Sequence, residues 1–202
     1  MTTRILIAED IELVAEAFQA LLSIEPEFEV VGRVSRGDEL VTCATRLMPD
    51  LILADIDMPG ATGIEATKTL RSMGYKGHII LLTALPGSGH LHAALAAGAD
   101  GYLLKAMTGA SLMNAIRAVQ NGHTAIDPDI AATAMRKGPS PLTQRETEIL
   151  KMVAAGFSTA QIADQMYLSK GTVRNYLSMV MSKLEVDSRT AAVTKAQHEG
   201  WL

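Results

Sequence analysis

The sequence contains a single cysteine, Cys43, among its 202 residues. One thiol cannot form a disulfide within the chain or supply a metal site with several thiolates, so both are excluded. The apolar runs are only a few residues long, whereas a helix that crosses a bilayer needs about 20. The first residues also lack the long apolar core of a signal peptide. We therefore predict a cytoplasmic protein that does not insert directly into a membrane.

Neither sign of charge dominates the chain, which has 18 lysines and arginines against 22 aspartates and glutamates. The two ends differ, however. Residues 1–139 carry 11 basic and 16 acidic side chains, whereas residues 140–202 carry seven and six. This less acidic C-terminal part is compatible with nucleic-acid binding, but it is not basic enough to indicate such binding by charge alone.

Over residues 1–121, short apolar segments alternate with helical patterns. The apolar segments cover 5–8, 28–31, 51–54, 78–82 and 101–104, and the helical patterns cover 11–24, 37–48, 63–73, 89–98 and 108–121. Parallel strands that are covered on both faces have this apolar character. The alternation predicts an α/β domain with a five-stranded parallel sheet. If its strand order is the flavodoxin-like 2-1-3-4-5, the first and third strands are neighbours.

The pattern changes after residue 121. Residues 122–141 are predicted to be a linker, because they contain the turn-forming sequence G-P-S-P after a short helix that starts near Pro128. Residues 142–202 show helical patterns and no strand pattern, which predicts a small all-α domain of four helices. The first of these helices opens with a capping box, from Thr143 to Glu146.

Polar side chains follow four of the predicted strands. Glu9 and Asp10 come after the first strand, and Asp55 ends the third. Thr83 ends the fourth strand, and Lys105 follows the fifth. Because the carboxyl ends of parallel strands lie at one edge of the sheet, where ligands bind, we expect these side chains to share a cleft.

The chemistry of this cleft suits phosphoryl transfer. Neighbouring carboxylates repel one another unless a cation is present, and oxygen ligands at a strand edge suit Mg²⁺. Asp55, in the centre, can act as a nucleophile toward phosphorus and form an aspartyl phosphate. Lys105 is then placed to neutralise one phosphoryl oxygen, and the Thr83 hydroxyl to donate a hydrogen bond to another.

The residues at these strand ends also match a known family. The matching positions are Glu9-Asp10, Asp55 followed by Met58-Pro59-Gly60, Thr83, and Gly101-Tyr102-Leu103-Leu104-Lys105. Together they resemble the CheY-like receiver domain of bacterial two-component response regulators. The resemblance implies that a sensor histidine kinase phosphorylates Asp55. It further implies that Glu9, Asp10 and Asp55 bind the metal with the backbone carbonyl of Asp57, and that Thr83, Lys105 and Tyr102 respond to the phosphoryl group.

One helix of the second domain has two distinct faces. Within residues 170–184, Val173, Leu177 and Val180 form one apolar stripe. The opposite face carries Arg174 and Asn175, whose side chains pair with guanine and adenine in the major groove. A short helix and a tight turn precede this segment, so it is predicted to be the recognition helix of a helix-turn-helix.

Motifs throughout the second domain support this interpretation. They are Leu142-Thr143-x-Arg145-Glu146, Gly156-x-Ser158, Gln161-Ile162-Ala163, Ser169-x-x-Thr172-Val173 and Lys183-Leu184-x-Val186-x-x-Arg189. They resemble the LuxR-type helix-turn-helix domain of the NarL/FixJ response regulators, most closely its DesR-like members. The resemblance implies that Arg174, Asn175 and Ser178 face the bases of double-stranded DNA. The residues that it assigns to phosphate contacts are Lys170, Thr172, Tyr176 and Lys183.

The same resemblance implies a homodimer that forms on phosphorylation and binds a two-fold symmetric operator. In the second domain, the predicted contacts between copies are Ala191, Ala192 and Val193 of the last helix. In the receiver, the fifth helix has more apolar residues than one buried stripe requires. Met113 lies off the line of that stripe, and we therefore predict that Met113 joins Leu13 and Ala17 of the first helix in the interface.

The sequence thus predicts a phosphorylation-switched transcription factor rather than an enzyme. One alternative is a regulator that binds DNA without being phosphorylated. A less favoured alternative is a phosphatase that uses Asp55-Ile56-Asp57 as a D-x-D motif, with Asp55 as the nucleophile. Two strands are predicted to precede this motif, whereas such phosphatases carry it on an early strand, and a DNA-binding domain would have no role there.

Overall fold

A computed structural model describes residues 2–84, 88–137, 140–199 and 201–202. The chain divides into two compact units: the first consists of residues 1–86 and 91–132, and the second of residues 87–90 and 133–202. Within the described residues, the structure contains no helix with both the length and the apolar character needed to cross a membrane.

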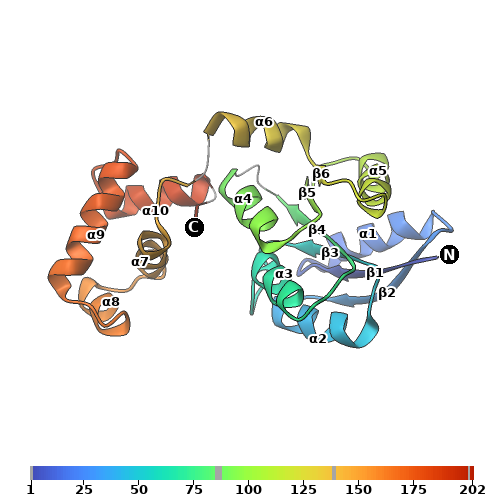
Figure 1. The fold of residues 1–202 in the computed structure, drawn as a ribbon, viewed down its shortest axis with the longest axis horizontal. Coiled ribbons are helices and arrows are strands. Elements are labelled where there is room, and N and C mark those ends of the chain that lie inside the picture. The colour runs from blue at the N-terminus through green and yellow to red at the C-terminus, as the bar shows by residue number, and fades with distance from the viewer. Residues whose placement is uncertain (1, 85–87, 138–139, 200) are drawn as a thin grey trace. The chain divides into compact units, whose positions relative to one another are not determined.

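The first unit alternates strands with helices (Figure 1). Its elements are β1 (Thr3–Ala8), α1 (Glu12–Ser23), β2 (Phe28–Val34), α2 (Gly37–Leu47), β3 (Leu51–Asp55), α3 (Gly63–Ser72), β4 (His78–Thr83), α4 (Ser88–Ala97), β5 (Gly101–Leu104), α5 (Gly109–Gln120), β6 (Ala125–Ile126) and α6 (Pro128–Lys137), which continues into the second unit. The strands pair in parallel in the order β2-β1-β3-β4-β5-β6. The flavodoxin-like order of the first five strands is thereby confirmed.

The prediction of five strands was wrong, because β6 adds a sixth. Ala125 pairs with Gly101 and Ile126 with Tyr102, within the segment that we had predicted as linker. The backbone N–H of Asp127 also donates a hydrogen bond to the Tyr102 carbonyl, at 3.0 Å. A strand of two residues is too short to show a periodic pattern, and only its partner strand makes it recognisable.

The sheet is buried on both faces, as its apolar strands predict. Ile5, Leu53 and Ile80 are at most 1% exposed and belong to one core cluster with residues of α1 and α5. Strand residues alternate between faces, so Leu6 and Ile52 face the opposite side, which α2 and α3 cover (Figure 1). This arrangement leaves the carboxyl ends of the strands as the place where polar residues gather.

Met113 lies inside the core, so the prediction that it faces outward from α5 was wrong. Its side chain is only 6% exposed and packs in the same cluster as Phe18 and Leu22 of α1. Helix α5 contacts both β4 and β6 and shares this core with α1. The buried part of its surface is therefore wider than one line of residues along the helix. Leu13 is 75% exposed and Ala17 is also exposed, so both remain available at the surface.

The second unit contains the four predicted helices. They are α7 (Gln144–Ala154), α8 (Thr159–Gln165), α9 (Lys170–Lys183) and α10 (Arg189–His198), and α9 contacts each of the other three. The predicted capping box opens α7, with the Thr143 side chain accepting from the Glu146 backbone and the Glu146 side chain accepting in return. Ser158 and Gln161 form a second capping box at α8.

One predicted contact between copies is buried in this helical unit. Ala192 is fully buried in a cluster with Val180 and Leu184, because α10 packs with this side against α7 and α9. Its assignment to a surface between copies was therefore wrong. Ala191 and Val193 are half-buried, and Val193 packs against the same cluster.

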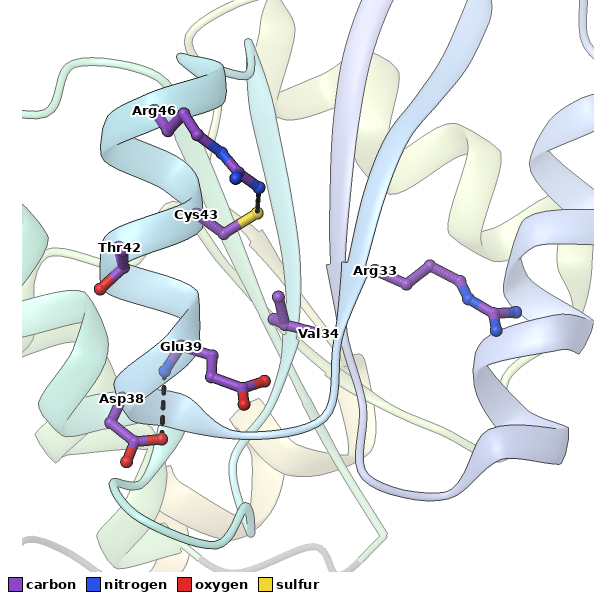
Figure 2. A pocket seen from close by; sticks show the side chains of 7 residues that line it. All are labelled: Arg33, Val34, Asp38, Glu39, Thr42, Cys43 and Arg46. Atoms are coloured by element: carbon purple, nitrogen blue, oxygen red, sulfur yellow. Dashed lines mark hydrogen bonds between the residues drawn. The ribbon is translucent and has the colours of Figure 1, made fainter.

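A hollow of about 560 Å³ lies beside α2. Figure 2 shows that its polar side chains do not converge: Arg33 points away from α2, and its guanidinium pairs with Glu12 on α1. Arg46 lies 3.7 Å from the sulfur of Cys43, which is 9% exposed. This hollow therefore lacks the convergent chemical groups found at the strand ends.

Candidate functional site

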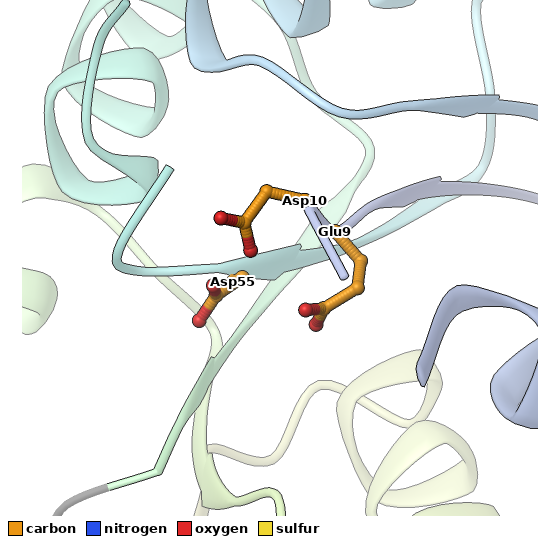
Figure 3. Close-up of side chains that lie close together, drawn as sticks. All are labelled: Glu9, Asp10 and Asp55. Carbon is orange, nitrogen blue, oxygen red and sulfur yellow. The ribbon is translucent and has the colours of Figure 1, made fainter. Parts of the chain in front are cut away.

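Four strand ends bring the predicted site residues to one edge of the sheet. Glu9 and Asp10 follow β1, and Asp55 is the last residue of β3, which pairs with β1. Figure 3 shows the three carboxylates close together at this edge. Thr83 ends β4 and Lys105 follows β5, so the same edge also supplies a hydroxyl and an ammonium group.

The three carboxylates fit a hard divalent cation. Each offers one oxygen, and these oxygens lie within 4.8 Å of one another. Glu9 and Asp55 are 2% and 3% exposed, whereas Asp10 is exposed on the open side. A few carboxylate oxygens beside an open face match Mg²⁺, which keeps several of its waters when it binds. Binding of the metal by the backbone carbonyl of Asp57 stays a prediction.

Lys105 is the counter-charge for the two buried acids. Its Nζ lies 2.8 Å from Glu9 Oε2 and 3.1 Å from Asp55 Oδ2, and its side chain is 15% exposed. Burial lowers the pKa of Lys105, but the hydrogen bond with Glu9 and the charge of Asp55 outweigh burial and raise that pKa overall. The ammonium group is thus held in its charged form beside the carboxylate that we expect to react.

Burial also controls the titration of Asp55. Removal from water raises the pKa of the Asp55 carboxyl from 3.8 to about 6. The charge of Lys105 and a hydrogen bond from the Asp57 backbone act in the opposite direction, while the charge of Glu9 adds to the rise. Without a bound cation, Asp55 is therefore a carboxylate at neutral pH that the fold holds at a cost in free energy.

This cost predicts a pH-dependent stability effect in the metal-free protein. Because the folded pKa of Asp55 lies above the unfolded value, folded protein binds the proton more tightly, and stability falls as pH rises from about 4 to 6. We expect Asp55→Asn to increase the free energy of unfolding by about 2 kcal/mol near pH 8 and by roughly half as much near pH 5. Urea unfolding in EDTA measures both values.

Asp57→Asn is the matched control, because Asp57 lies two residues away but is exposed. It should leave the free energy of unfolding unchanged at both pH values. Equal stabilisation by Asp55→Asn at the two pH values would contradict the assigned cause, since uncharged packing does not titrate.

Thr83 and Tyr102 lie behind the acidic cluster on neighbouring strands. Thr83 is 1% exposed and Tyr102 is fully buried. Burial raises the pKa of the Tyr102 hydroxyl, and the neighbouring Thr83 hydroxyl partly offsets that rise. The response of Thr83 and Tyr102 to a phosphoryl group stays a prediction.

Gly63 is a site residue that the sequence analysis missed. Its backbone N–H donates to the Ile56 carbonyl at 2.9 Å, and a side chain added at this position would collide with the backbone carbonyl of Asp55. Only glycine lets the start of α3 approach the end of β3 this closely. No sequence pattern marks this position, because the requirement arises from two backbone segments that meet in the fold.

The second unit exposes the predicted base-reading face of α9. Arg174, Asn175 and Ser178 are exposed, whereas Val173 and Leu177 on the other side are at most 1% exposed. The Ser169 side chain accepts a hydrogen bond from the Thr172 backbone at 3.0 Å and caps the helix. The positive end of the helix dipole therefore coincides with an exposed Lys170.

The predicted phosphate contacts have different surroundings. Lys170 is exposed, whereas Thr172 and Tyr176 are half-buried, and the Thr172 hydroxyl lies 2.8 Å from that of Ser169. Lys183 donates to Glu146 Oε2 at 2.7 Å and so ties α9 to α7. Each of these phosphate contacts stays a prediction, but Lys183 has a structural partner that the sequence analysis missed.

The carboxylate in this ion pair is buried, with only 2% of Glu146 exposed. Burial raises the pKa of Glu146, but its hydrogen bonds with Lys183 and Thr143 outweigh burial and hold that pKa below its ordinary value. Glu146 therefore caps α7 and anchors α9 with the same carboxylate.

Comparisons with known proteins cover both units. Residues 5–117 match the response regulator receiver domain, and residues 140–196 match the luxR family of bacterial regulatory proteins. The transcriptional regulatory protein DesR of Bacillus subtilis is 41% identical over 198 residues, which cover 98% of each chain. Both the acidic strand ends and the exposed helix therefore lie within matched regions.

Solved structures resemble the whole chain. The response regulator ChrA of a heme-sensing two-component system is 32% identical, with a TM-score of 0.59 over 100% of this chain and 99% of that one. RcsB from Salmonella enterica serovar Typhimurium, bound to promoter DNA, has a TM-score of 0.71 over 98% of this chain and 99% of its own. At 24% identity, the likeness to RcsB shows the fold alone.

Proposed function

This chain belongs to the two-component response regulators that join a receiver domain to a LuxR-type DNA-binding domain, and from that premise we propose that phosphorylation of Asp55 controls its binding to DNA. The family consists of DNA-binding transcription regulators rather than enzymes, so the phosphatase alternative is set aside. We further propose that the protein acts in the cytoplasm and receives its phosphoryl group from a sensor histidine kinase.

The observation that carries the proposal is the placement of Lys105 between two buried carboxylates. The Lys105 ammonium group lies 2.8 Å from Glu9 and 3.1 Å from Asp55, so it places a positive charge between two carboxylates at the end of the sheet. Asp10 adds a third, exposed carboxylate on the open side of this ion pair. This combination suits a site that alternates between carboxylate and acyl phosphate.

In the proposed reaction, an oxygen of Asp55 forms a bond to phosphorus as the bond from phosphorus to the kinase's histidine nitrogen breaks. Glu9, Asp10 and Asp55 would hold Mg²⁺, which supplies positive charge to the phosphoryl oxygens when bound. Lys105 can turn from the Asp55 carboxylate to a phosphoryl oxygen. Thr83 can donate its hydroxyl hydrogen to another oxygen and so change its contact with Tyr102.

We propose that phosphorylation favours a homodimer whose two recognition helices read a two-fold symmetric operator. Arg174, Asn175 and Ser178 are the proposed base-reading residues. The half-sites would lie about one helical turn apart, because each α9 enters a major groove on the same side of the duplex. Phosphorylation can shift the population from monomer to dimer only by as much as the phosphoryl group stabilises the dimer relative to the monomer.

The assembly is tested on the exposed part of α1. Leu13→Asp places like charges at the proposed receiver interface, so we expect the dimer of phosphorylated protein to weaken about tenfold or more. Acceptance of the phosphoryl group should be unchanged, because Leu13 is not among the strand-end residues. Sedimentation velocity of phosphorylated wild type and variant measures the effect.

Met73→Asp is the matched control, because Met73 is 58% exposed at the end of α3, on the other side of the sheet. It should dimerise as wild type does. If phosphorylated wild type stays monomeric on its own and on DNA, the proposal of dimerisation on phosphorylation is contradicted. If wild type dimerises and Leu13→Asp dimerises equally well, the interface does not include Leu13.

A further inference from the structure

Tyr167 lies in the turn between α8 and α9 and is 95% exposed. Its φ is 55°, in the left-handed region that is disfavoured for residues with a Cβ atom. At other helix ends in the described part of the chain, Gly74, Gly98, Gly122 and Gly156 adopt this conformation, and so do the non-glycine residues Met48 and Glu185. The turn of a helix-turn-helix also often contains glycine. Tyr167 is therefore an aromatic residue where the backbone favours glycine.

Nothing in the packing of the helical unit accounts for a tyrosine here. The neighbouring Met166 and Leu168 pack against a buried cluster that includes Ile162 and Val173, whereas the Tyr167 side chain remains outside it. The backbone N–H of Tyr167 points to the Asp164 carbonyl at 3.4 Å, and glycine could make the same contact. The exposed phenol ring is thus available for contact with a molecule outside the folded chain.

The position of the turn indicates which class of molecule could make this contact. Tyr167 comes two residues before Ser169, which caps the amino end of α9, and three before the exposed Lys170. When a recognition helix enters the major groove amino end first, the turn before it lies close to the phosphodiester backbone. Positive charge from Lys170 and from the helix dipole favours an anionic partner at this place.

We propose that Tyr167 is a contact residue for the backbone of double-stranded DNA. Its hydroxyl donates a hydrogen bond to a phosphate oxygen, and its ring packs against the adjoining deoxyribose; tyrosine is among the side chains that make such contacts. The contact positions α9 in the groove without selecting a base sequence. This inference rests on the proposed function, in which α9 reads DNA.

The test measures binding of the phosphorylated full-length protein to a fluorescent duplex of about 30 base pairs with random sequence, because a backbone contact acts on any sequence. Tyr167→Phe removes only the hydroxyl and should weaken binding about threefold. Tyr167→Gly removes the ring as well and should weaken binding about tenfold, while its melting temperature stays equal or rises because the left-handed strain is relieved. The salt dependence should not change, since no charge is removed.

Met48→Gly is the matched control. Met48 is also exposed and left-handed, with a φ of 46°, but it lies at the end of α2 in the first unit. This variant should gain the same relief of strain and bind the duplex as wild type does.

The outcomes separate this inference from the proposed function. If Arg174→Ala weakens DNA binding but both Tyr167 variants bind as wild type does, the inference alone is overturned. It is also overturned if only Tyr167→Gly loses affinity and its melting temperature falls, because the tyrosine then has a folding role. If phosphorylated wild type does not bind the duplex at all, it is the proposed function that fails.

Discussion

Asp55→Asn is expected to accept no phosphoryl group from acetyl phosphate in the presence of Mg²⁺, whereas wild type gains one acid-labile group. The amide cannot form an acyl phosphate, so the loss should be complete rather than partial. The change leaves the shape of the strand end almost unaltered, and Lys105 keeps its contact with Glu9 at 2.8 Å. Intact-protein mass spectrometry before and after mild acid measures the added phosphoryl group.

Asp57→Asn provides the control on the same loop. Its side chain is exposed, and the predicted role of Asp57 uses the backbone carbonyl, which the substitution retains. This variant should be phosphorylated to the same extent as wild type. Phosphorylation of Asp55→Asn at the wild-type level would place the acceptor at another residue.

Asp10→Ala gives a separate measure of the acidic cluster. It removes the one exposed carboxylate of the three that lie within 4.8 Å. Because the site has few protein ligands, loss of one oxygen should shift the half-point of a Mg²⁺ titration of the phosphorylation rate to higher concentration. An unchanged half-point would mean that Asp10 is only a solvated loop residue.

Arg174→Ala is expected to lose about 1–3 kcal/mol of DNA-binding free energy and to relax base preference at one step of each half-site. Arg174 is exposed on the face of α9 opposite the buried Val173 and Leu177, where a guanidinium can make two hydrogen bonds with guanine. Removing a base contact weakens the preferred sequence more than the others. Selection from a randomised duplex pool at one fixed salt concentration measures the preference.

Lys170→Ala is the comparison, because Lys170 is equally exposed on the same helix but is predicted to contact phosphate. It should weaken binding to all sequences by a similar factor and reduce the slope of log affinity against log salt by about 1. Should both variants lose affinity with no change of preference, the face of α9 that reads bases is not the one that carries Arg174.

The strand ends could be located from the sequence because buried parallel strands consist almost entirely of apolar residues. Asp55 directly follows four such residues of β3, and Lys105 directly follows β5, so chemistry and strand end coincide along the chain. The same holds for α9, where burial at Val173 and Leu177 determines which residues face outward. These features depend on local pattern and needed no knowledge of the rest of the fold.

Other features depend on parts of the chain that meet only in the folded protein. The pair of Lys183 with Glu146 joins residues 37 positions apart, and no pattern along α9 distinguishes that lysine from a free one. The burial of Met113 and Ala192 depends on how many neighbours each helix packs against, which periodicity alone does not report. Tyr167 was likewise not singled out, because its left-handed backbone is visible only in the structure.

The two edges of the receiver sheet are both poorly suited to pairing with another strand. On one side, β6 has only two residues and is followed closely by Pro128, which has no N–H to donate. On the other side, the register between β1 and β2 shifts between Ile5 and Leu6, which interrupts the regular backbone of the outer strand. Short or irregular edge strands prevent the sheets of two molecules from pairing edge to edge. In the proposed dimer, two receivers would therefore associate through helices and side chains rather than by pairing of strands.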